Sequence, residues 1–173
     1  MNSVEIKAAL QTFTVLIDTR EQLTPRYYER IKAMGVPCER VKLDFGDYSA
    51  RVTLPGGKVF SLAKTACIER KMNIDELCSC FGKERKRFEN EFKRALSAGA
   101  RVYLLLENTS WEQMYYGFYR SQMKPKALIA SLAVWMTRYN CGVITCQPSV
   151  TGQIIRDILY REMKERLAEY GRA

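Results

Sequence analysis

Acidic and basic side chains at short spacings give this sequence its clearest chemical signal. Asp47 lies in a Gly-Asp-Tyr triplet, and Glu69-Arg70-Lys71 and then Asp75 follow further along the chain. Carboxylates are the ligands that hard divalent cations prefer. A cation that activates water, with a lysine beside it to stabilise developing negative charge, can hydrolyse phosphodiester bonds.

The Glu69-Arg70-Lys71 triplet is predicted to end a strand. Neighbouring side chains point to opposite faces of a strand, so Glu69 and Lys71 share one face and Arg70 points to the other. We therefore expect Glu69 to hold a metal ion while Lys71 reaches the same phosphate group. Because the chain contains no histidine, a mechanism that uses a histidine base is excluded.

A second acid must come from another strand, and Asp47 and Asp18 are the candidates. Asp47 begins a strand that turns back at Pro55–Gly57, but a simple hairpin at that turn pairs Asp47 with Thr65 rather than Glu69. A bulge or a longer connection is therefore required. Asp18 lies at the end of the first strand. Several acids close together repel one another, and bound Mg²⁺ or Mn²⁺ would remove that cost.

The composition is that of a basic globular protein. The 173 residues are 47% hydrophobic, and 28 lysines and arginines against 19 acids give a formal charge of +9. This length supports one domain with a core, and the charge favours nucleic acid as a partner. The longest apolar run, 127–136, is too short to span a bilayer, and the N-terminus lacks a signal-peptide core. We expect a soluble cytoplasmic protein (nucleoid-associated if bacterial or from a phage) with no membrane partner.

The six cysteines are expected to be free, buried thiols in a reducing compartment, because they lie mostly in apolar surroundings and no signal peptide precedes them. They are Cys38, Cys67, Cys78, Cys80, Cys141 and Cys146. A zinc site is not expected, because Cys78-Ser79-Cys80 is too tightly spaced and has no matching second pair.

Turn residues, caps and apolar periodicity predict an alternation of strands and helices. Strands are predicted at 13–17, 36–43, 48–54, 59–70, 102–106 and 143–146. Helices are predicted at 25–34, after Asn73, at 83–97, after Ser110, at 125–139 and after Ser149. This order predicts an α/β fold with a central mixed sheet and helices on both faces. A single domain over 1–173, with its core at about 13–165, is expected.

Local details of the helices are also predicted. Asn73 and Glu76 are expected to form a capping box, as are Ser110 and Gln113. On the 83–97 helix, the residues expected to face the core are Phe88, Phe92, Ala95 and Leu96.

The order of these motifs resembles the XPF/Hef family of nucleases. The chain contains Asp18-Thr19-Arg20-Glu21, Gly46-Asp47-Tyr48 and Glu69-Arg70-Lys71-Met72-Asn73-Ile74-Asp75, which fits that family's signature of GD, a variable gap and ERK-x-x-x-D. The resemblance extends over about 13–165. It implies a restriction-endonuclease-like fold and metal-dependent endonuclease activity on branched, flapped or forked DNA in repair or recombination.

The resemblance also implies a role for each matching residue. The metal ligands, for Mg²⁺ or Mn²⁺, would be Asp18, Asp47 and Glu69. The catalytic lysine would be Lys71. Supporting or substrate-positioning roles would fall on Arg20, Glu21, Arg70 and Asp75. Family members usually add a helix-hairpin-helix module, and some add a helicase; neither is expected in this chain, which is similar to compact stand-alone versions from bacteria and phages.

Several surfaces are candidates for partner binding. A stripe on the 83–97 helix either grips phosphates or is an ordinary solvated face; it consists of Lys86, Arg87, Asn90, Lys93 and Arg94. The aromatic segment 115–119, beside Arg120 and Lys124, either stacks on unpaired bases or, as we favour, packs in the core or a dimer contact.

The helix at 125–139 is apolar almost all round, so either the core is thick there or a second subunit covers it. Members of the XPF/Hef family, which this sequence resembles, often dimerise through this end of the domain. We therefore expect a homodimer through the C-terminal helices. Two rival functions stay open: a catalytically inactive DNA-binding scaffold and an RNA-directed nuclease.

Overall fold

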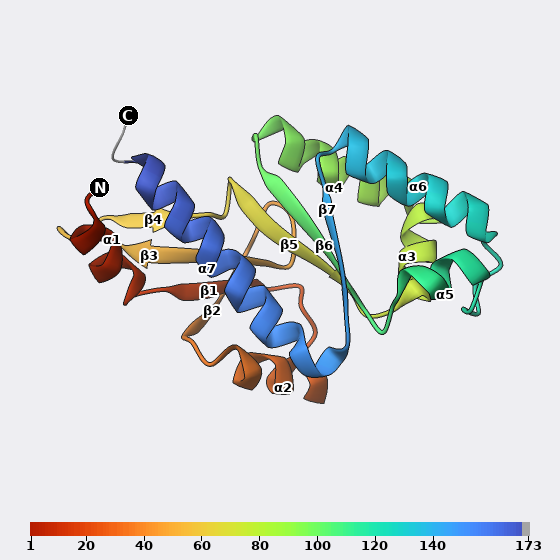
Figure 1. Cartoon of the computed structure of the whole chain (residues 1–173), viewed down its shortest axis with the longest axis horizontal. Helices are drawn as coiled ribbons and strands as arrows, with labels where there is room; N and C mark the ends of the chain where they lie inside the picture. The colour runs from red at the N-terminus through yellow and green to blue at the C-terminus, as the bar shows by residue number, and fades with distance from the viewer. Residues whose placement is uncertain (171–173) are drawn as a thin grey trace.

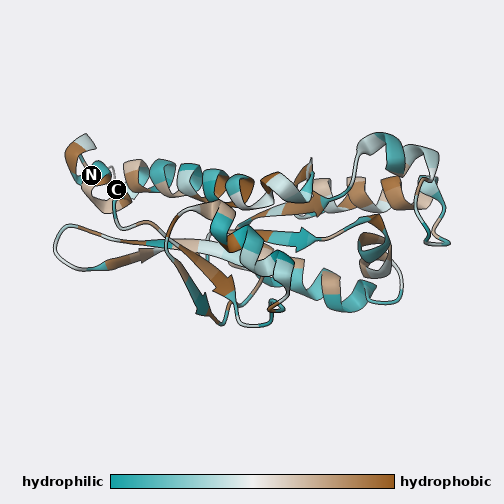
Figure 2. Ribbon diagram, turned by 90° about the horizontal axis from the view of Figure 1, so that it is seen from below, coloured by the Kyte–Doolittle hydropathy of each residue, from teal (hydrophilic) through white to brown (hydrophobic). Residues whose placement is uncertain are grey.

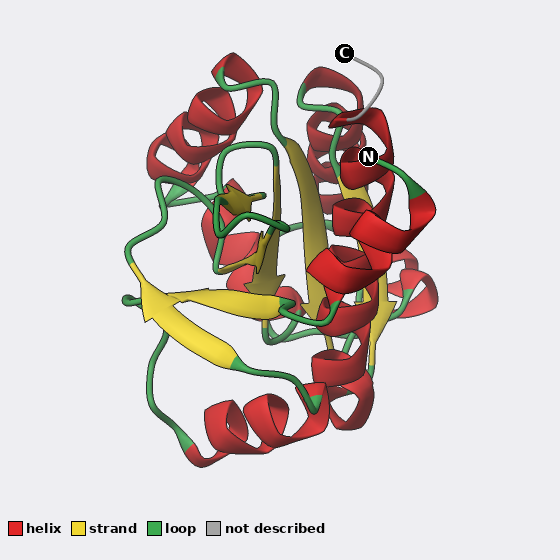
Figure 3. Cartoon of the chain, turned by 90° about the vertical axis from the view of Figure 1, so that its left-hand side faces the viewer, coloured by secondary structure: helices red, strands yellow, loops and turns green. Residues whose placement is uncertain are grey.

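The computed structural model describes residues 1–170, and its centre is a twisted mixed sheet of seven strands (Figures 1 and 3). The strands are β1 (Thr14–Asp18), β2 (Cys38–Val41), β3 (Tyr48–Thr53), β4 (Val59–Ser61), β5 (Ala66–Lys71), β6 (Arg101–Glu107) and β7 (Gly142–Cys146). Their order is β2-β1-β3-β5-β6-β7, with β4 paired to β3. Strand β3 is antiparallel to β1 and β5, and the β1–β2, β5–β6 and β6–β7 pairs are parallel. The predicted mixed sheet is confirmed.

Helices cover both faces of this sheet. They are α1 (Ser3–Leu10), α2 (Pro25–Met34), α3 (Ile74–Phe81), α4 (Arg85–Ser97), α5 (Trp111–Tyr116), α6 (Pro125–Arg138) and α7 (Thr151–Tyr170), with a short 3-10 turn at Pro148–Val150. In Figure 2 the helices carry both polar and apolar bands, as expected for elements that bury one face. Across residues 1–170, no helix combines the length and the apolar character needed to cross a bilayer.

Two separate cores form because side chains alternate along the central strands. Leu104 and Leu106 on β6 pack with α3, α4 and α6, whereas Leu105 between them packs with α1, α2 and α7. The first core is rich in aromatic rings, with Trp135 of α6 stacked on Phe88 of α4 at a centroid distance of 5.7 Å. The Gly-Asp and Glu-Arg-Lys motifs lie directly before β3 and at the end of β5, between these two cores.

The predicted long strand 59–70 is two strands, and the break between them sets the register. Arg51 pairs with Ser61 across β3 and β4, as a simple hairpin requires. If that register continued, Tyr48 would lie opposite Lys64. It lies opposite Ile68 instead, because residues 62–65 leave the ladder before β5 begins. The longer connection that the sequence required is therefore present, and it brings β5 into register beside the start of β3.

Several local predictions are confirmed. The side chain of Thr24 caps α2, and Gly35 ends that helix in the left-handed region at φ +63°. Ser110 and Gln113 form the expected capping box of α5. The six cysteines are free: four are buried, and Cys38 and Cys146 are half-buried.

Other local predictions are wrong. Asn73 does cap α3, but the Glu76 carboxylate accepts its hydrogen bond from the Met72 N–H instead of completing the capping box. Ser149 lies in the 3-10 turn, and α7 starts at Thr151. Leu96 is exposed, because it lies outside the arc of α4 that faces the core. Helix α1, with its own capping box, was not predicted.

Helix α6 is buried on one side only. Leu128, Leu132 and Trp135 enter the core, whereas Met136 is 39% exposed. The prediction of a thick core around this helix is therefore wrong. An apolar face of α6 is left at the surface, where Ala130 and Ala133 are exposed and Ile129 is half-buried.

Candidate active site

Glu69 and Lys71 share one face at the end of β5, as alternation along the strand predicts. The Lys71 ammonium Nζ lies 2.6 Å from Oε1 of Glu69, and both side chains are almost fully buried. Lys71 also lies over the Phe88 ring of α4, 5.1 Å from its centroid. Glu76 of α3 places a carboxylate oxygen 3.8 Å from the same ammonium. Packing of α3 and α4 thus fixes the position of the lysine.

Asp47 reaches this site because Gly46 allows a very close approach to β5. Gly46 has φ +71°, and a Cβ atom there would lie 2.7 Å from Sγ of Cys67. The Asp47 N–H donates to the Ile68 carbonyl at 2.8 Å, and the Asp47 carboxylate accepts from the Arg70 N–H at 2.8 Å. The Gly-Asp pair therefore places a carboxylate directly beside the Glu69-Arg70-Lys71 strand.

The electrostatics of Asp47, Glu69 and Lys71 are those of a crowded buried site. Burial raises the pKa of Glu69, and the negative charge of Asp47 raises it further. Burial likewise raises the pKa of Asp47, against the opposing effect of Lys71. For Lys71, burial lowers the pKa, but the charges of Glu69 and Asp47 and the hydrogen bond to Glu69 are among the effects that together outweigh burial, and the net pKa is raised. Asp47 and Glu69 repel each other when both are ionised, and a bound cation would stabilise the ionised form of both carboxylates.

Asp18 is engaged by hydrogen bonds from its own turn and from the segment before Asp47. One carboxylate oxygen accepts from the N–H and the Nε–H of Arg20, at 2.7 and 2.6 Å, and the other accepts from the Leu43 N–H at 2.7 Å. Burial raises the pKa of Asp18, but these hydrogen bonds lower it more, so the net pKa is lowered. Within residues 1–170 no three acidic or thiol side chains are grouped as a metal site. The role of Asp18 as a ligand stays a prediction.

Arg70 points to the opposite face, where it joins a buried network of charges with Glu21. Its Nε donates to Glu21 at 3.1 Å, and its Nη1 donates to Glu107 at 3.1 Å. Arg30 of α2 donates to the same Glu21 oxygen at 2.9 Å, and the Tyr48 hydroxyl also donates to it. The two motif residues thus hold the loop between β1 and α2 together with α2, β3, β5 and β6.

Asp75 does not face Glu69 and Lys71. Its carboxylate accepts from the N–H groups of Arg120 and Ser121, at 2.9 and 2.7 Å, and from Nε of Arg120 at 3.3 Å. Asp75 therefore connects the start of α3 to the loop between α5 and α6.

Glu91 of α4 is a site residue that sequence reasoning missed. Its Oε1 accepts from the Gly46 N–H at 3.0 Å, and its negative charge raises the pKa of Glu69. From the sequence, Glu91 belongs to a solvated helix face. Its place directly before the buried Phe92 was the available signal, because such a residue lies at the edge of the buried arc. Two other missed residues, Arg30 and Glu107, complete the Glu21–Arg70 network together with Tyr48, which the sequence placed in the motif without a role.

A cavity of about 680 Å³ opens beside this network. Its lining includes five arginines, which are Arg20, Arg26, Arg30, Arg70 and Arg87. Asp47, Glu69 and Lys71 do not line it, but Glu76, which lies near Lys71, does. Three glutamates, Glu21, Glu76 and Glu107, also line it, so the lining keeps a small excess of positive charge, which suits a phosphate backbone.

The predicted basic stripe on α4 is at the surface. Lys86, Arg87, Lys93 and Arg94 are all exposed. Arg87 pairs with Glu84, Lys93 lies 3.1 Å from Glu89, and Arg94 donates to the Asp44 carbonyl. Their contact with nucleic acid stays a prediction.

Comparisons with known proteins agree with the resemblance found in the sequence. The sequence model of the ERCC4 domain matches residues 17–157. The fold matches XPF from Aeropyrum pernix, with a TM-score of 0.61 and 18% identity over 88% of this chain and 68% of that chain. It also matches XPF from Aeropyrum pernix in complex with DNA, with a TM-score of 0.61 and 21% identity over 88% of this chain and 66% of that chain.

The chain thus spans about two thirds of each of those structures, and no curated protein matches it. The restriction-endonuclease-like fold, with its mixed sheet between two helical layers, is confirmed. The match of 17–157 covers most of the chain and includes the Gly-Asp and Glu-Arg-Lys motifs. By its sequence motifs and its fold, this chain belongs to the ERCC4 domain family.

Proposed function

We propose that this chain is a metal-dependent endonuclease that hydrolyses phosphodiester bonds in DNA. The observation that carries the proposal is the convergence of Asp47, Glu69 and Lys71 at the junction of β3 and β5. Glu69 and Lys71 are buried and Asp47 is half-buried, and two carboxylates and an ammonium group have no structural need to be together in such a place. The unfavourable free energy of burying these charges is explained if the site binds a metal ion and a charged substrate.

The donor set fits Mg²⁺ or Mn²⁺. Both cations prefer carboxylate oxygens. Among the residues that the structure describes, Asp47 and Glu69 each have a carboxylate oxygen without a hydrogen bond, whereas both oxygens of Asp18 accept hydrogen bonds from Arg20 and Leu43. Asp47 and Glu69 would hold the ion, with Asp18 as a third ligand only if Arg20 releases it. A bound cation would lower the pKa of a water molecule and neutralise charge on the phosphate.

The remaining steps belong to residues of this chain. Lys71, held by Glu69 and the Phe88 ring, would stabilise the negative charge that develops on the phosphate and orient the attacking water. Arg20 and Arg87 line the adjoining cavity and would bind the flanking phosphates. Glu21 and Arg70 act indirectly, because their network fixes the strands that carry the site.

The substrate we propose is branched, flapped or forked DNA, as met in repair or recombination. Membership of the ERCC4 domain family supports a DNA endonuclease, and a similar fold is known in complex with DNA. An RNA substrate and a catalytically inactive scaffold are the alternatives that the experiment must separate.

The test is cleavage of labelled duplex, flap, fork and single-stranded DNA, and of RNA, with Mn²⁺, Mg²⁺ or EDTA. Asp47→Asn and Lys71→Ala should abolish cleavage and leave DNA binding largely intact. Asp44→Asn is the matched control, because Asp44 is an exposed acid outside the site. Wild-type turnover in either site variant contradicts the assignment. Binding without any cleavage supports the scaffold, and cleavage of RNA alone supports the RNA nuclease.

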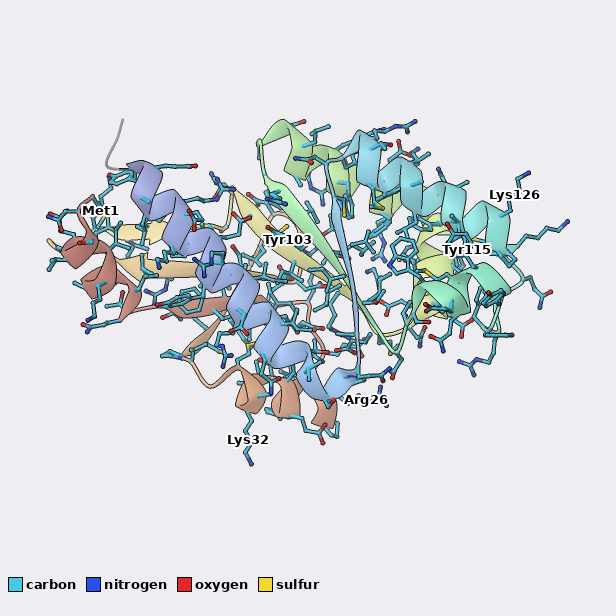
Figure 4. All side chains as sticks on the ribbon, viewed as in Figure 1. Met1, Arg26, Lys32, Tyr103, Tyr115 and Lys126 are labelled. Atoms are coloured by element: carbon cyan, nitrogen blue, oxygen red, sulfur yellow. The ribbon has the colours of Figure 1, made fainter. Side chains whose placement is uncertain are left out.

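We also infer a homodimer through α6. The exposed face of this helix is apolar, with Ile129, Ala130 and Ala133 lining a cavity of about 690 Å³ together with Tyr115 of α5. Figure 4 shows Tyr115 and Lys126 at this end of the molecule. Light scattering should give a dimer that Ala133→Glu dissociates. A monomer at every concentration contradicts the inference.

A further inference from the structure

We propose that the end of α5 and the loop after it carry a second nucleic-acid subsite, which binds unpaired bases and which Asp75 holds beside the active site. Its rings are Tyr116 and Phe118, and its cation is Arg120. We call residues 116–124 the aromatic loop. The inference rests on the proposed function only in taking nucleic acid as the substrate.

The rings of the aromatic loop face solvent. Tyr116 is 70% exposed and Phe118 is 68% exposed. The core-packing part of the favoured prediction is therefore wrong for both rings, and the dimer contact stays a prediction. Their ring centroids lie 5.8 Å apart, which makes a pair of neighbouring flat surfaces. Exposed rings of this kind are platforms on which unpaired bases stack, whatever their sequence.

The charge around these rings fits a polyanion. From Gln113 to Lys126 the chain contains no acidic residue, whereas Arg120, Lys124 and Lys126 supply three positive charges. The Arg120 side chain is 89% exposed, although it contacts Asp75. Charge complementarity therefore favours single-stranded nucleic acid as the occupant.

Asp75 fixes the aromatic loop near the catalytic lysine. It accepts three hydrogen bonds from Arg120 and Ser121, two of them from backbone N–H groups. Only Met72–Ile74 separate Asp75 from Lys71, so the two Cα atoms lie at most about 14 Å apart. The last acid of the Glu-Arg-Lys motif is therefore a positioning residue, because it acts through the loop and not on the cation.

The aromatic loop is also braced from within. The Tyr119 hydroxyl donates to the Met123 carbonyl at 2.8 Å, and the Met123 N–H donates to the Ser121 hydroxyl. Gly117 turns the chain in the left-handed region at φ +75°. A braced loop presents its rings without an ordering cost at the moment of binding.

The rings of the subsite do not line the cavity that we assign to the dimer, although Lys124 of the aromatic loop does. Tyr115 lines the apolar cavity on α6, whereas Tyr116 and Phe118 do not. On α5, successive residues point in different directions around the helix. Variants at Tyr116 and Phe118 can therefore test base stacking without changing the α6 face.

The experiment measures binding in EDTA, so that it does not depend on cleavage. The probes are a blunt DNA duplex, the same duplex with a single-stranded tail, and the tailed duplex with 2-aminopurine in the tail. The variants are Tyr116→Ala with Phe118→Ala, Arg120→Ala, and the pair Phe118→Trp and Phe118→Leu. Tyr28→Ala is the control, because Tyr28 is a similarly exposed aromatic residue on α2.

The loss of each stacked ring should weaken binding of the tailed duplex about ten-fold and leave the blunt duplex unchanged. Phe118→Trp should keep the affinity and Phe118→Leu should lose it, because a ring is needed and not merely an apolar group. The wild type should quench 2-aminopurine in the tail, and the double alanine variant should not. Tyr28→Ala should behave as wild type.

Three outcomes overturn the proposal: unchanged affinity for the tailed duplex, an equal loss on tailed and blunt duplexes, or an altered oligomeric state with unchanged affinity. The last would assign the rings to a contact between copies. Failure of all DNA cleavage would count against the proposed function alone, because the binding difference is measured without metal.

Discussion

The ammonium group of Lys71 lies 2.6 Å from the carboxylate of Glu69, two positions earlier on the same strand. Both side chains are buried, so each depends on the other for its charge. A cation bound at Glu69 would share that carboxylate with the lysine, and the same pair would then serve both folding and catalysis.

Removal of this lysine is expected to destabilise the metal-free protein. Lys71→Met leaves Glu69 buried without its partner and should lower the free energy of unfolding by about 3 kcal/mol. The double variant with Glu69→Gln should recover most of that loss. Urea unfolding in EDTA measures the loss in the single variant and the recovery in the double variant. Added Mn²⁺ should stabilise Lys71→Met more than it stabilises the double variant. Equal stability of the single variant and the wild type contradicts this account.

Gly46 is expected to be essential for the position of Asp47. In Gly46→Ala the new Cβ would meet Sγ of Cys67 at 2.7 Å, in addition to the strain of φ +71°. Positive φ alone costs about 1–3 kcal/mol, and displacement of Asp47 should remove cleavage as well. Gly35→Ala is the control, because Gly35 has φ +63° and open space around it. It should lose stability and keep its activity; loss of activity in both variants would point to general instability.

The shared face of Glu69 and Lys71 was predictable from the sequence, but the partners of the motif residues were not. Alternation placed Glu69 and Lys71 together because it is a local rule of strands. The register of Asp47 against β5 depends on the break at residues 62–65, which no local pattern encodes. Glu91, Arg30 and the loop partner of Asp75 come from elements distant in sequence, and only tertiary packing brings them to the motif residues.

Because of Glu21, the free energy of unfolding is expected to fall as the pH becomes acidic. Burial raises the pKa of Glu21, but the charge of Arg70, the Tyr48 hydroxyl and Arg30 lower it more, and the net pKa lies below 4.5. An acid with a lowered folded-state pKa stabilises the fold above its unfolded pKa, and this contribution is lost as the pH falls through the folded-state value. Glu21→Gln should therefore cost about 3 kcal/mol at neutral pH.

This difference between Glu21→Gln and the wild type should narrow as the pH falls below 4.5, because the wild-type carboxylate then binds a proton too. Thermal unfolding from about pH 7 to about pH 3 measures it. Glu165→Gln, at an exposed acid of α7, should differ little from the wild type at any pH. A difference that stays constant over this range would show that Glu21 is not held as a carboxylate by its arginines.

The stripe on α4 is expected to contribute to the salt dependence of DNA binding. For duplex DNA, the logarithm of the binding constant falls with the logarithm of the salt concentration, and the slope steepens by about 0.9 for each phosphate that the protein neutralises. Lys86→Gln with Lys93→Gln should make the slope shallower by that amount for each lysine that touches a phosphate. Arg161→Gln with Lys164→Gln removes the same charge from α7, which packs on the opposite face of the sheet. Condensed counterions are released only where the protein touches DNA, so the variant pair on α7 should leave the slope unchanged. If both pairs change the slope equally, the stripe on α4 acts only through the net charge of the protein and does not contact DNA.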